Sequence, residues 1–512
     1  MSKFLVGIPM NVRTKSTAFY VASSFLLTLG ISFPAEAHFG FDFHEHGQQD
    51  SSNVSSFTIP TNATEASNTL EITADGDTPV VLPDVDRPGF WLFSDNAEFV
   101  EIGDNTDGQL ALFDFITLPG GPLPHYHTLE DEFVYVLDGE ITYQVRDQVF
   151  TATPGTFISK PKDVLHAFVN AGEKPARHIE FVIPAGIDGL FELLGQPGTS
   201  DNPPFPQLPT PELLEGGFQL LSDFGVVAPD SLLITPPQFG ITQEGDPELV
   251  VIRPGEADGE ASATLIVSNP EDDSTVAEIP VTFEDGERIQ NVEITGIEGA
   301  ENQNFELTLV DPIDTSIALL QNKALLTLGE DNTYTLIDGY SPDDFPLLLP
   351  DPNPNSFWLG GSNYTQVANL NQTEGLLSLF DVFIPEQNSG IEELLTAPTD
   401  LALYTLDGEL TINVADQSFS ADPDTFIYLP EGSKYSFSNF ETFSARTLLF
   451  TADNPSELEE FVMTFGISDD QDNVNIPEPS LISGLLLMAC SAGSLLKKNR
   501  KSLDQKINFR VN

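Results

Sequence analysis

The 512-residue chain contains a single cysteine, which excludes a disulfide-based scaffold and any metal site built from several thiolates. It is also poor in basic residues, with 20 Lys and Arg against 79 Asp and Glu, and its formal net charge is −59 at pH 7. Because nucleic-acid binding relies on Lys and Arg that neutralise phosphates, this charge argues against a nucleic-acid partner. Hydrophobic residues still make up 40% of the chain, including 38 Phe, so a sizeable core can form.

The few basic residues are concentrated at the two ends of the chain. Nine of the 20 lie before residue 38 or after residue 496, which leaves 11 basic against 77 acidic residues in between. That central section therefore has a net charge of −66, and the two ends need a separate interpretation.

The first 37 residues have the order of a secretory signal peptide. A basic start is followed by an apolar stretch from Ala18 to Phe33 and by Ala35-Glu36-Ala37, a small-x-small cleavage pattern. The alternative is a transmembrane anchor, which the short apolar stretch with its Ser and Thr residues disfavours. We expect the mature chain to begin at His38 with a polar linker over residues 38–80, which is rich in Ser, Thr, Asn, Gln and Gly.

The C-terminal region, residues 474–501, combines three features in a fixed order. Pro477-Glu478-Pro479 is followed by an apolar stretch from Ser480 to Leu496 and by a basic cluster from Lys497 to Lys501. This order resembles the PEP-CTERM sorting signal of bacteria. The resemblance implies recognition by an exosortase-type sorting machinery and export to the cell surface or extracellular matrix. The alternative is a plain tail anchor, in which the mature protein keeps the apolar helix.

The centre of the chain contains an internal repeat. Val134–Pro161 recurs as Leu403–Pro430 at an offset of 269, and Leu110–Ile116 recurs as Leu377–Phe383 at an offset of 267. Both copies alternate apolar and polar residues in short runs interrupted by Asp-Gly and Pro, a pattern typical of antiparallel strands. A short helix is expected after each copy, at Pro211–Leu214 behind a Thr cap and at Glu457–Phe465 behind a Ser cap.

Residues 228–335, between the two copies, have a different pattern. Short apolar strands at regular spacing indicate a β-sandwich, with strands expected at 249–254, 263–268, 277–283, 290–297, 305–311 and 324–331. Glu244-Gly245 and Phe283–Glu287 resemble the Calx-β family, an immunoglobulin-like sandwich that binds calcium. The family's usual Asp-Asp pair is replaced by Gly296–Glu301, and calcium needs six to eight oxygen ligands. A calcium site is one interpretation, and an acidic spacer without calcium is the favoured one.

The first copy carries a cluster of metal-binding residue types. His125 and His127 are two residues apart and therefore share one face of a strand. Glu132 is expected to return beside them after a turn over residues 128–131, and His166 supplies a third imidazole from a later strand. Imidazoles and a carboxylate suit Fe, Mn, Ni, Co, Zn or Cu without choosing between them. Four protein ligands leave positions on such a metal for a substrate or water.

These residues stand in two motifs that resemble those of the cupin family. The first, His-x-His-x4-Glu-x6-Gly, runs from His125 to Gly139, and the second, Gly-x5-Pro-x4-His-x3-Asn, runs from Gly155 to Asn170. The surrounding run resembles cupins of the quercetin-dioxygenase type. The resemblance implies a double-stranded β-helix barrel, a metal held by the four residues, and a catalytic role for Glu132 as a base. Asp163 replaces a Gly that is usual in the second motif.

The second copy keeps the strand pattern but loses the ligands. At an offset of 269 the four ligand positions are occupied, in order, by Leu394, Thr396, Leu401 and Tyr435, and the first three assignments can slide by two residues. No His occurs after His178, so no slide restores the site. His178 itself matches no ligand position and is expected to be packed or hydrogen-bonded in its strand. We expect a degenerate barrel that folds without this metal.

Together these patterns predict an all-β chain. Two cupin barrels with their short helices, at 81–227 and 346–466, are separated by the Calx-β-type sandwich. One functional hypothesis is an exported mononuclear-metal dioxygenase that acts on a small oxygenated molecule such as an enol or a flavonol. The other is a non-catalytic cell-surface or matrix protein that binds a saccharide or another ligand and whose metal is structural.

Overall fold

The computed structural model describes residues 80–468 except for 83–86, 93, 104–105, 107, 173, 201–216, 218–219, 236–241, 298–299, 301, 331–332, 389–394 and 415–416. The predicted signal peptide, nearly all of the polar linker, the sorting signal and the predicted helix at Pro211–Leu214 lie outside these residues. No helix in the described part is long and apolar enough to cross a membrane. The chain divides into two units, Met1–Glu71 and Ile72–Asn512, and the account below concerns the second.

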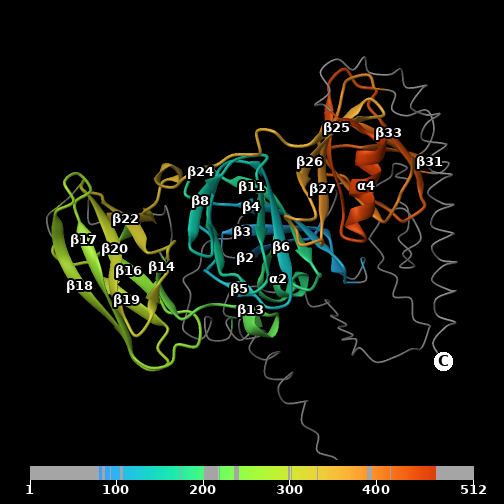
Figure 1. Ribbon diagram of the computed structural model, residues 1–512. Coiled ribbons are helices and arrows are strands. Elements are labelled where there is room, and N and C mark those ends of the chain that lie inside the picture. Colours follow the sequence, from blue (N-terminus) through green and yellow to red (C-terminus); the bar gives the residue numbers. More distant parts are fainter. Residues whose placement is uncertain are drawn as a thin grey trace, which may run out of the picture. The chain divides into compact units, whose positions relative to one another are not determined.

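The first barrel is built from two sheets. The larger sheet has the order β12-β2-β3-β4-β11-β6-β9, whose bounds are Gln196–Pro197, Gly89–Leu92, Asp95–Glu101, Ala111–Thr117, Ala176–Ile183, Asp131–Asp138 and Phe157–Lys160. The smaller sheet has the order β10-β7-β8-β24, with bounds His166–Val169, Ile141–Val145, Gln148–Ala152 and Leu347–Leu348. Strand β5 (Tyr126–His127) pairs with β13 (Val226–Val227) beside them. In Figure 1 these strands are blue and teal, except for β13, which is green, and β24, which is gold.

Alternation along β6 decides what faces the barrel interior. Val134 and Val136 belong to a core cluster that also contains residues of the smaller sheet, whereas Phe133 and Tyr135 pack against residues of the second barrel. The predicted Asp-Gly turn follows β6 and leads to the other sheet. Gly139 there has φ +76°, and a Cβ would lie 2.8 Å from the Ala176 Cβ, so the turn requires glycine.

A helix that the sequence patterns did not predict follows β11. Helix α2 (Asp188–Leu194) buries Leu190, Phe191 and Leu194. The Phe191 ring lies 5.5 Å and 5.7 Å from the rings of Phe113 and Phe115 on β4, so α2 closes one side of the barrel interior.

The insert forms two sheets, and all six expected strands are present. One sheet has the order β19-β16-β14-β21 and the other β15-β23-β22-β20-β17-β18. The bounds in chain order from β14 to β23 are Ser231–Thr235, Gln243–Glu244, Glu248–Ile252, Ala261–Ser268, Thr275–Phe283, Ile289–Glu293, Asn304–Ile313, Ser316–Ile317, Lys323–Leu328 and Thr333–Asp338. Strict alternation along β17 places Leu265 and Val267 in the core shared by the two sheets. The sequence patterns did not predict strands β14, β15, β21 and β23.

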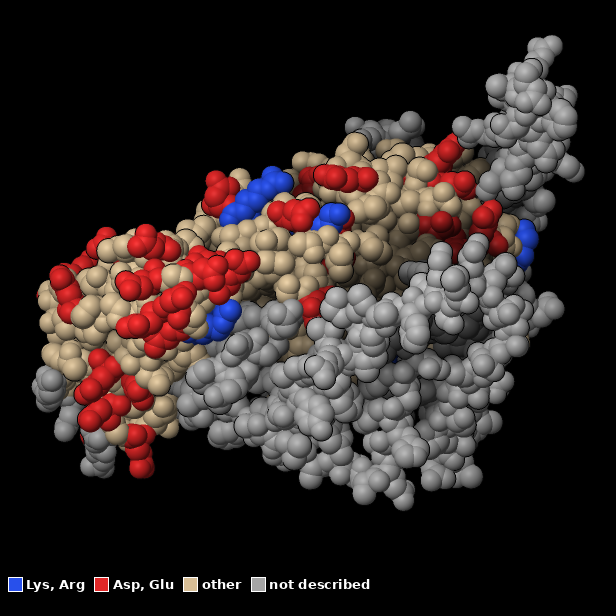
Figure 2. All heavy atoms as spheres, turned by 90° about the horizontal axis from the view of Figure 1, so that it is seen from below, with Lys and Arg blue, Asp and Glu red and all other residues tan. Residues whose placement is uncertain are grey.

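The surface of the insert is acidic, as the red side chains of Figure 2 illustrate for one face of the molecule. Its exposed acids include Glu271, Asp272, Asp273, Glu278, Glu284, Asp285 and Glu293. One basic side chain in the described part of the insert is fully buried. The buried Arg253 guanidinium donates to both Asp230 carboxylate oxygens at 2.7 Å, and to the carbonyls of Asp258 at 2.8 Å and Gly259 at 2.7 Å. Calcium binding by the insert stays a prediction.

The second barrel repeats the strand order of the first. Its sheets are β1-β32-β29-β34-β27-β26-β25-β35 and β28-β33-β30-β31. The bounds are Val80–Leu82 for β1 and, in chain order from β25 to β35, Ser356–Leu359, Ser362–Ala368, Ser378–Ile384, Leu395–Thr396, Leu401–Asp407, Leu410–Val414, Gln417–Ala421, Phe426–Leu429, Lys434–Ser438, Ala445–Thr451 and Ile467–Ser468. Helix α4 (Pro455–Phe465) follows β34. It begins before the expected Ser456 cap, because Asn454 in a left-handed conformation (φ +47°) turns the chain into Pro455 at the first helical position.

Strand register corrects two of the residue equivalences between the barrels. His125 pairs with His166, and Leu395 pairs with Tyr435 at the same place in the second barrel. The carbonyl of His127 accepts from Asp163, and that of Ala397 accepts from Gly432. The counterparts of His125 and His127 are therefore Leu395 and Ala397 rather than Leu394 and Thr396. Compared with the first copy, the second has three additional residues between Leu377 and Leu395 and one residue fewer between Ala397 and Leu401. Leu401 and Tyr435 stand as expected.

The two barrels meet through matched residues. The Tyr135 hydroxyl donates to Asp381 at 2.9 Å, and the Tyr404 hydroxyl donates to Asp114 at 2.7 Å. Arg446 pairs with Asp381 as Arg177 pairs with Asp114, and Arg177 also pairs with Asp424. Each barrel also receives a strand from the segment that precedes the other, since β1 pairs with β32 and β24 pairs with β8.

Candidate metal centre

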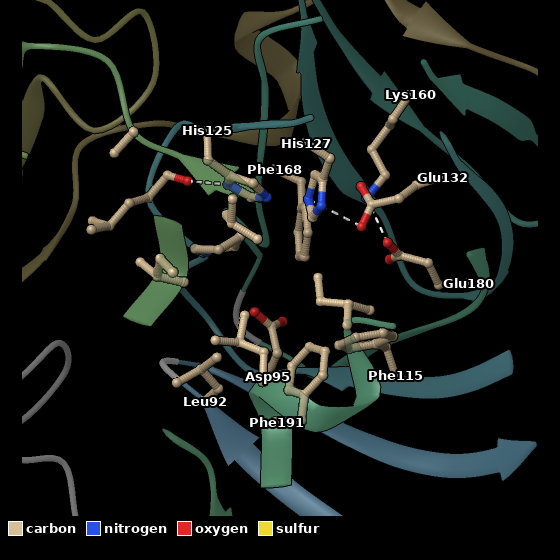
Figure 3. A pocket seen from close by; sticks show the side chains of 17 residues that line it. Leu92, Asp95, Phe115, His125, His127, Glu132, Lys160, Phe168, Glu180 and Phe191 are labelled. Atoms are coloured by element: carbon tan, nitrogen blue, oxygen red, sulfur yellow. Dashed lines mark hydrogen bonds and ion pairs between the residues drawn. The ribbon is translucent and has the colours of Figure 1, made fainter. Parts of the chain in front are cut away.

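The structure brings the four side chains expected from the sequence together inside the first barrel. His125 directly precedes β5, His127 lies in β5, Glu132 lies in β6 and His166 begins β10. The ligand atoms of the three histidines all lie within 4.8 Å of one another, and among the described residues this is the one such group of three or more His, Cys, Asp or Glu. Figure 3 shows His125, His127 and Glu132 side by side along one wall of a cavity.

Each histidine ring is oriented by an oxygen at its Nδ1 atom. The His125 Nδ1 lies 2.6 Å from the Leu123 carbonyl, and the His166 Nδ1 lies 3.0 Å from the Val164 carbonyl. The His127 Nδ1 lies 2.6 Å from the Glu130 carboxylate. Carbonyl and carboxylate oxygens accept hydrogen bonds, so in the neutral ring this arrangement places the proton on Nδ1 and leaves Nε2 as the electron-pair donor.

The Nε2 atoms face the carboxylate of Glu132. One Glu132 oxygen lies 3.2 Å from the His127 Nε2, and the other lies 3.1 Å from the His166 Nε2. Both nitrogens are buried, and neither makes a hydrogen bond of good geometry. Electron-pair donors at this separation need a positive charge between them, either a proton or a metal ion. The residues therefore fit a divalent transition metal, whose ligands are neutral imidazole and carboxylate.

A buried lysine that the motifs do not contain balances the carboxylate. Lys160 ends β9 directly opposite Glu132 in the strand register. Its ammonium group lies 3.0 Å from the Glu132 Oε2 and 2.8 Å from Glu180 on β11. All three side chains are at least 95% buried, so their charges are compensated within the protein rather than by water.

The protonation states follow from burial and from these neighbours. Burial holds the pKa of His125 well below its usual range and also lowers that of His166, so both favour the neutral form that binds metals. Burial opposes charge on His127 as well, but Glu132 and Glu130 outweigh it and raise the pKa of His127. Burial would raise the pKa of Glu132, but His127, Lys160 and His166 bring it well below its usual range. Such a carboxylate is suited to be a ligand, and its role as a base stays a prediction.

The turns around the site explain the departures from the family pattern. Asp163, which stands where a Gly is usual, has φ +60°, a left-handed conformation that Asp tolerates better than most residues. Asn170 does not face the metal centre but ties loops together. Its side chain donates to the carbonyls of Thr117 at 2.8 Å and Lys174 at 2.7 Å, and its oxygen accepts from the Gly172 amide.

A cavity of about 80 Å³ adjoins the metal-binding side chains. His125, His127 and Glu132 form one wall, and Phe115, Phe168, Leu190 and Phe191 contribute apolar walls. Val226 of β13, which pairs with His127, covers another side. The described part of the second barrel has a cavity of about 10 Å³ lined by Leu395, Ser362 and Phe437, the counterparts of His125, Asp95 and Phe168.

Besides Glu130, which the sequence patterns placed only in a turn, they missed three site residues that lie in strands: Asp95, Lys160 and Glu180. Each stands singly in a strand, and only the barrel topology brings β3, β9 and β11 to one cavity. A signal was nevertheless present, because register places Ser362, Leu429 and Leu449 at the same positions of the second barrel. His178 is fully buried and its ring stacks on Phe115 at 5.1 Å, so it is packed as expected.

A family match agrees with the first barrel. Residues 115–182 match the cupin domain family. No curated protein matches the chain. Among solved structures, oxalate decarboxylase of Bacillus subtilis is similar in a study of its Mn(II) centres (12% identity, 74% of this chain and 80% of that chain, TM-score 0.38) and in a structure at pH 4.6 (12% identity, 74% and 78%, TM-score 0.37).

Proposed function

We propose that the protein is an exported bicupin whose first barrel binds one divalent transition metal and acts on a small oxygenated molecule as a dioxygenase. The observation that supports this most is the group of buried histidine nitrogens that faces the Glu132 carboxylate beside a cavity. The second barrel supports the fold and has no role in the chemistry.

The residues of the first barrel have separate tasks in this proposal. His125, His127, Glu132 and His166 hold the metal, which would act as a Lewis acid on a substrate oxygen. Glu130 fixes the ring of His127 through Nδ1, and Lys160 keeps Glu132 ionised and in place. The aromatic walls keep bulk water away from the reacting group.

The open cavity argues against a purely structural metal. Structural sites are closed by protein ligands, whereas catalytic sites keep a position free for water or substrate. Here His125 is only partly buried and faces the cavity together with His127 and Glu132. The size of about 80 Å³ is roughly half that of an engineered cavity of ~150 Å³ that holds benzene, so it favours a small enol over a flavonol.

Metal content tests the first part of the proposal. The full chain, purified without chelators, should contain about one transition metal per molecule by mass spectrometry of the elements. His125→Ala should reduce this to background, and His44→Ala, which removes a histidine from the polar linker, should leave it unchanged. A wild-type chain without metal, or equal metal in His125→Ala, overturns the proposal.

Oxygen uptake tests the second part. The metal-loaded chain is offered enols and enediols of up to six carbons and, for comparison, the flavonol quercetin. Oxygen consumption with a small enol that His125→Ala abolishes supports a dioxygenase. Bound metal without any oxygen uptake overturns that part and supports the non-catalytic alternative, a surface protein that binds a saccharide or another ligand.

Export through both ends of the chain is part of the same proposal. The protein recovered from the cell surface should begin at His38 and lack the stretch after Pro479, as mass spectrometry of its terminal peptides can show. Retention of residues 480–501 would contradict processing by a sorting machinery and favour a tail anchor.

A further inference from the structure

Asp95 is a buried acid on the wall of the cavity that faces the metal-binding side chains. The residue is 3% exposed, and its Oδ1 atom is buried without a hydrogen-bond partner of good geometry. Figure 3 shows its carboxylate pointing into the cavity from the side opposite His127 and Glu132, beside Leu92 and Phe191. A buried polar atom without a partner destabilises a protein, so a ligand is the natural source of the missing hydrogen bond.

The surroundings of Asp95 leave that hydrogen bond to a ligand. Asp95 lies opposite Thr117 in the pairing of β3 with β4, and the Thr117 hydroxyl lies near its carboxylate without making a hydrogen bond of good geometry. The charged groups that act on it are Glu180 of β11 and Lys160 of β9, and these two already pair with each other at 2.8 Å. The space between Asp95 and the histidines is lined by Phe115, Phe168 and Phe191.

We infer that Asp95 is the second binding point of the cavity and receives a hydroxyl group of a small ligand, whose other oxygen function faces His125, His127 and Glu132. The inference rests on the proposed function and names its substrate class. The ligand is a short molecule with an oxygen function at each end and an apolar middle, which contacts the aromatic walls.

Charge favours a hydroxyl over a second carboxylate at this point. Burial raises the pKa of Asp95 to about 7. The nearby hydroxyl of Thr117, as a hydrogen-bond donor, opposes this rise, the negative charge of Glu180 adds to it, and the positive charge of Lys160 opposes it. A hydroxyl can donate to the ionised Asp95 and accept from the protonated one, so it binds in both states. A ligand carboxylate would be repelled by the ionised Asp95 and by Glu180.

A series of paired acids measures the contribution of the hydroxyl. The full chain is loaded with Co²⁺, and its visible absorption spectrum reports binding without any turnover. Acetate, propionate and butyrate are compared with glycolate, 3-hydroxypropionate and 4-hydroxybutyrate, which add a hydroxyl at the far end. At one chain length the hydroxy acid should bind the wild type about tenfold or more tightly than its parent, the effect of one hydrogen bond to a charged or buried group.

Two variants assign that advantage to Asp95. Asp95→Leu should bind the parent acid as the wild type does and lose the advantage of the hydroxyl, and Asp95→Asn should keep part of it through its amide. Asp95→Leu should also unfold at a higher temperature, because an apolar side chain of the same branched shape replaces a buried acid and extends into the adjoining cavity, which shows that the variant is folded. Ser362→Ala, at the matching position of the second barrel, should keep the full advantage.

The outcomes separate this inference from the proposed function. A chain that takes up no Co²⁺, or whose spectrum no acid changes, contradicts the proposed metal site itself. A chain that binds Co²⁺ and the parent acids, but gains nothing from a hydroxyl at any length, contradicts only the role of Asp95. The same holds if folded Asp95→Leu retains the advantage.

Discussion

The two barrels share strand order, turns and loop-tying residues, and they differ in what faces the cavity. Asn439 donates to the carbonyls of Ile384 and Phe443 as Asn170 does to those of Thr117 and Lys174. The positions of the four ligands are taken by Leu395, Ala397, Leu401 and Tyr435. The fold is thus maintained by features that are independent of the metal site.

The first barrel has three buried charged side chains beside its cavity, and all three have apolar counterparts in the second barrel. Glu132, Lys160 and Glu180 compensate one another, and Leu401, Leu429 and Leu449 stand in their places. Tyr364, at the position of Ala97, is fully buried and lines the small remaining cavity. Removing one member of a buried charged set leaves the others unpaired, whereas an apolar set in the same place is stable. An intermediate between the two barrels would be less stable than either.

The largest difference between the barrels should be in metal affinity. His127→Ala removes one of four ligands, and its effect should exceed the ~10–100-fold loss that is usual for a residue behind a ligand. Tyr435→Phe, at the position of His166 in the second barrel, should have no effect. Metal affinity is measured by competition with a coloured chelator, and a change in Tyr435→Phe would mean that the second barrel also takes part.

The next largest effect should come from the buried lysine. Lys160→Met leaves Glu132 and Glu180 without their counter-charge and should destabilise the metal-free first barrel by about 3–5 kcal/mol. Leu429→Met, at the position of Lys160 in the second barrel, replaces one apolar side chain by another of similar size and should cost less than ~1.5 kcal/mol. Hydrogen exchange of peptides from β6 and β29 reports the two barrels separately, and equal losses would contradict the account.

A pH dependence should distinguish the barrels through Asp95. Its pKa of about 7 in the folded chain lies above the ordinary value of 3.8, so between these pH values the folded state holds a proton that the unfolded state has released. The free energy of unfolding therefore falls as pH rises through this window and levels off above it. The Asn side chain of Asp95→Asn does not titrate. As pH rises from 4 to 7, the free energy of unfolding of this variant should therefore rise by about 4 kcal/mol relative to that of the wild type, at ~1.4 kcal/mol per pKa unit.

Hydrogen exchange of β3 peptides at several pH values measures this difference. Ser362→Ala, in the second barrel, serves as the control and should shift stability equally at all pH values. A constant difference between Asp95→Asn and the wild type would show that Asp95 is ionised throughout.

The smallest effect on stability should come from the contact between the two barrels, where both contribute matched residues. Tyr135→Phe and Tyr404→Phe each remove one hydroxyl that donates to an aspartate of the other barrel, and each should cost about 1.5–3 kcal/mol, the range for a hydrogen bond to a charged group. The two pairs share no partner, so their costs should add in the double variant. Chemical unfolding of the three variants tests this, and a strongly unequal pair would contradict the matched interface.

The sequence motifs predicted the four clustered side chains and the six strands of the insert, because spacing within a strand decides which face a residue occupies. They did not predict Lys160, Glu180 or Asp95, whose neighbours come from strands far apart in the sequence. They also misplaced Leu395 and Ala397 by one residue, because length changes between motifs cannot be located without strand pairing. The predicted start of α4 was wrong, because the left-handed conformation of Asn454 before Pro455 cannot be recognised from an Asn in the sequence alone.

The most direct test of the difference between the barrels is a crystal of the full chain measured at the absorption edge of its bound metal. The account predicts one anomalous peak per chain, in the first barrel between the Nε2 atoms of His125, His127 and His166 and the Glu132 carboxylate. No peak should lie beside Tyr435 in the second barrel. A peak at Tyr435, or none at the histidines in metal-loaded protein, would contradict it.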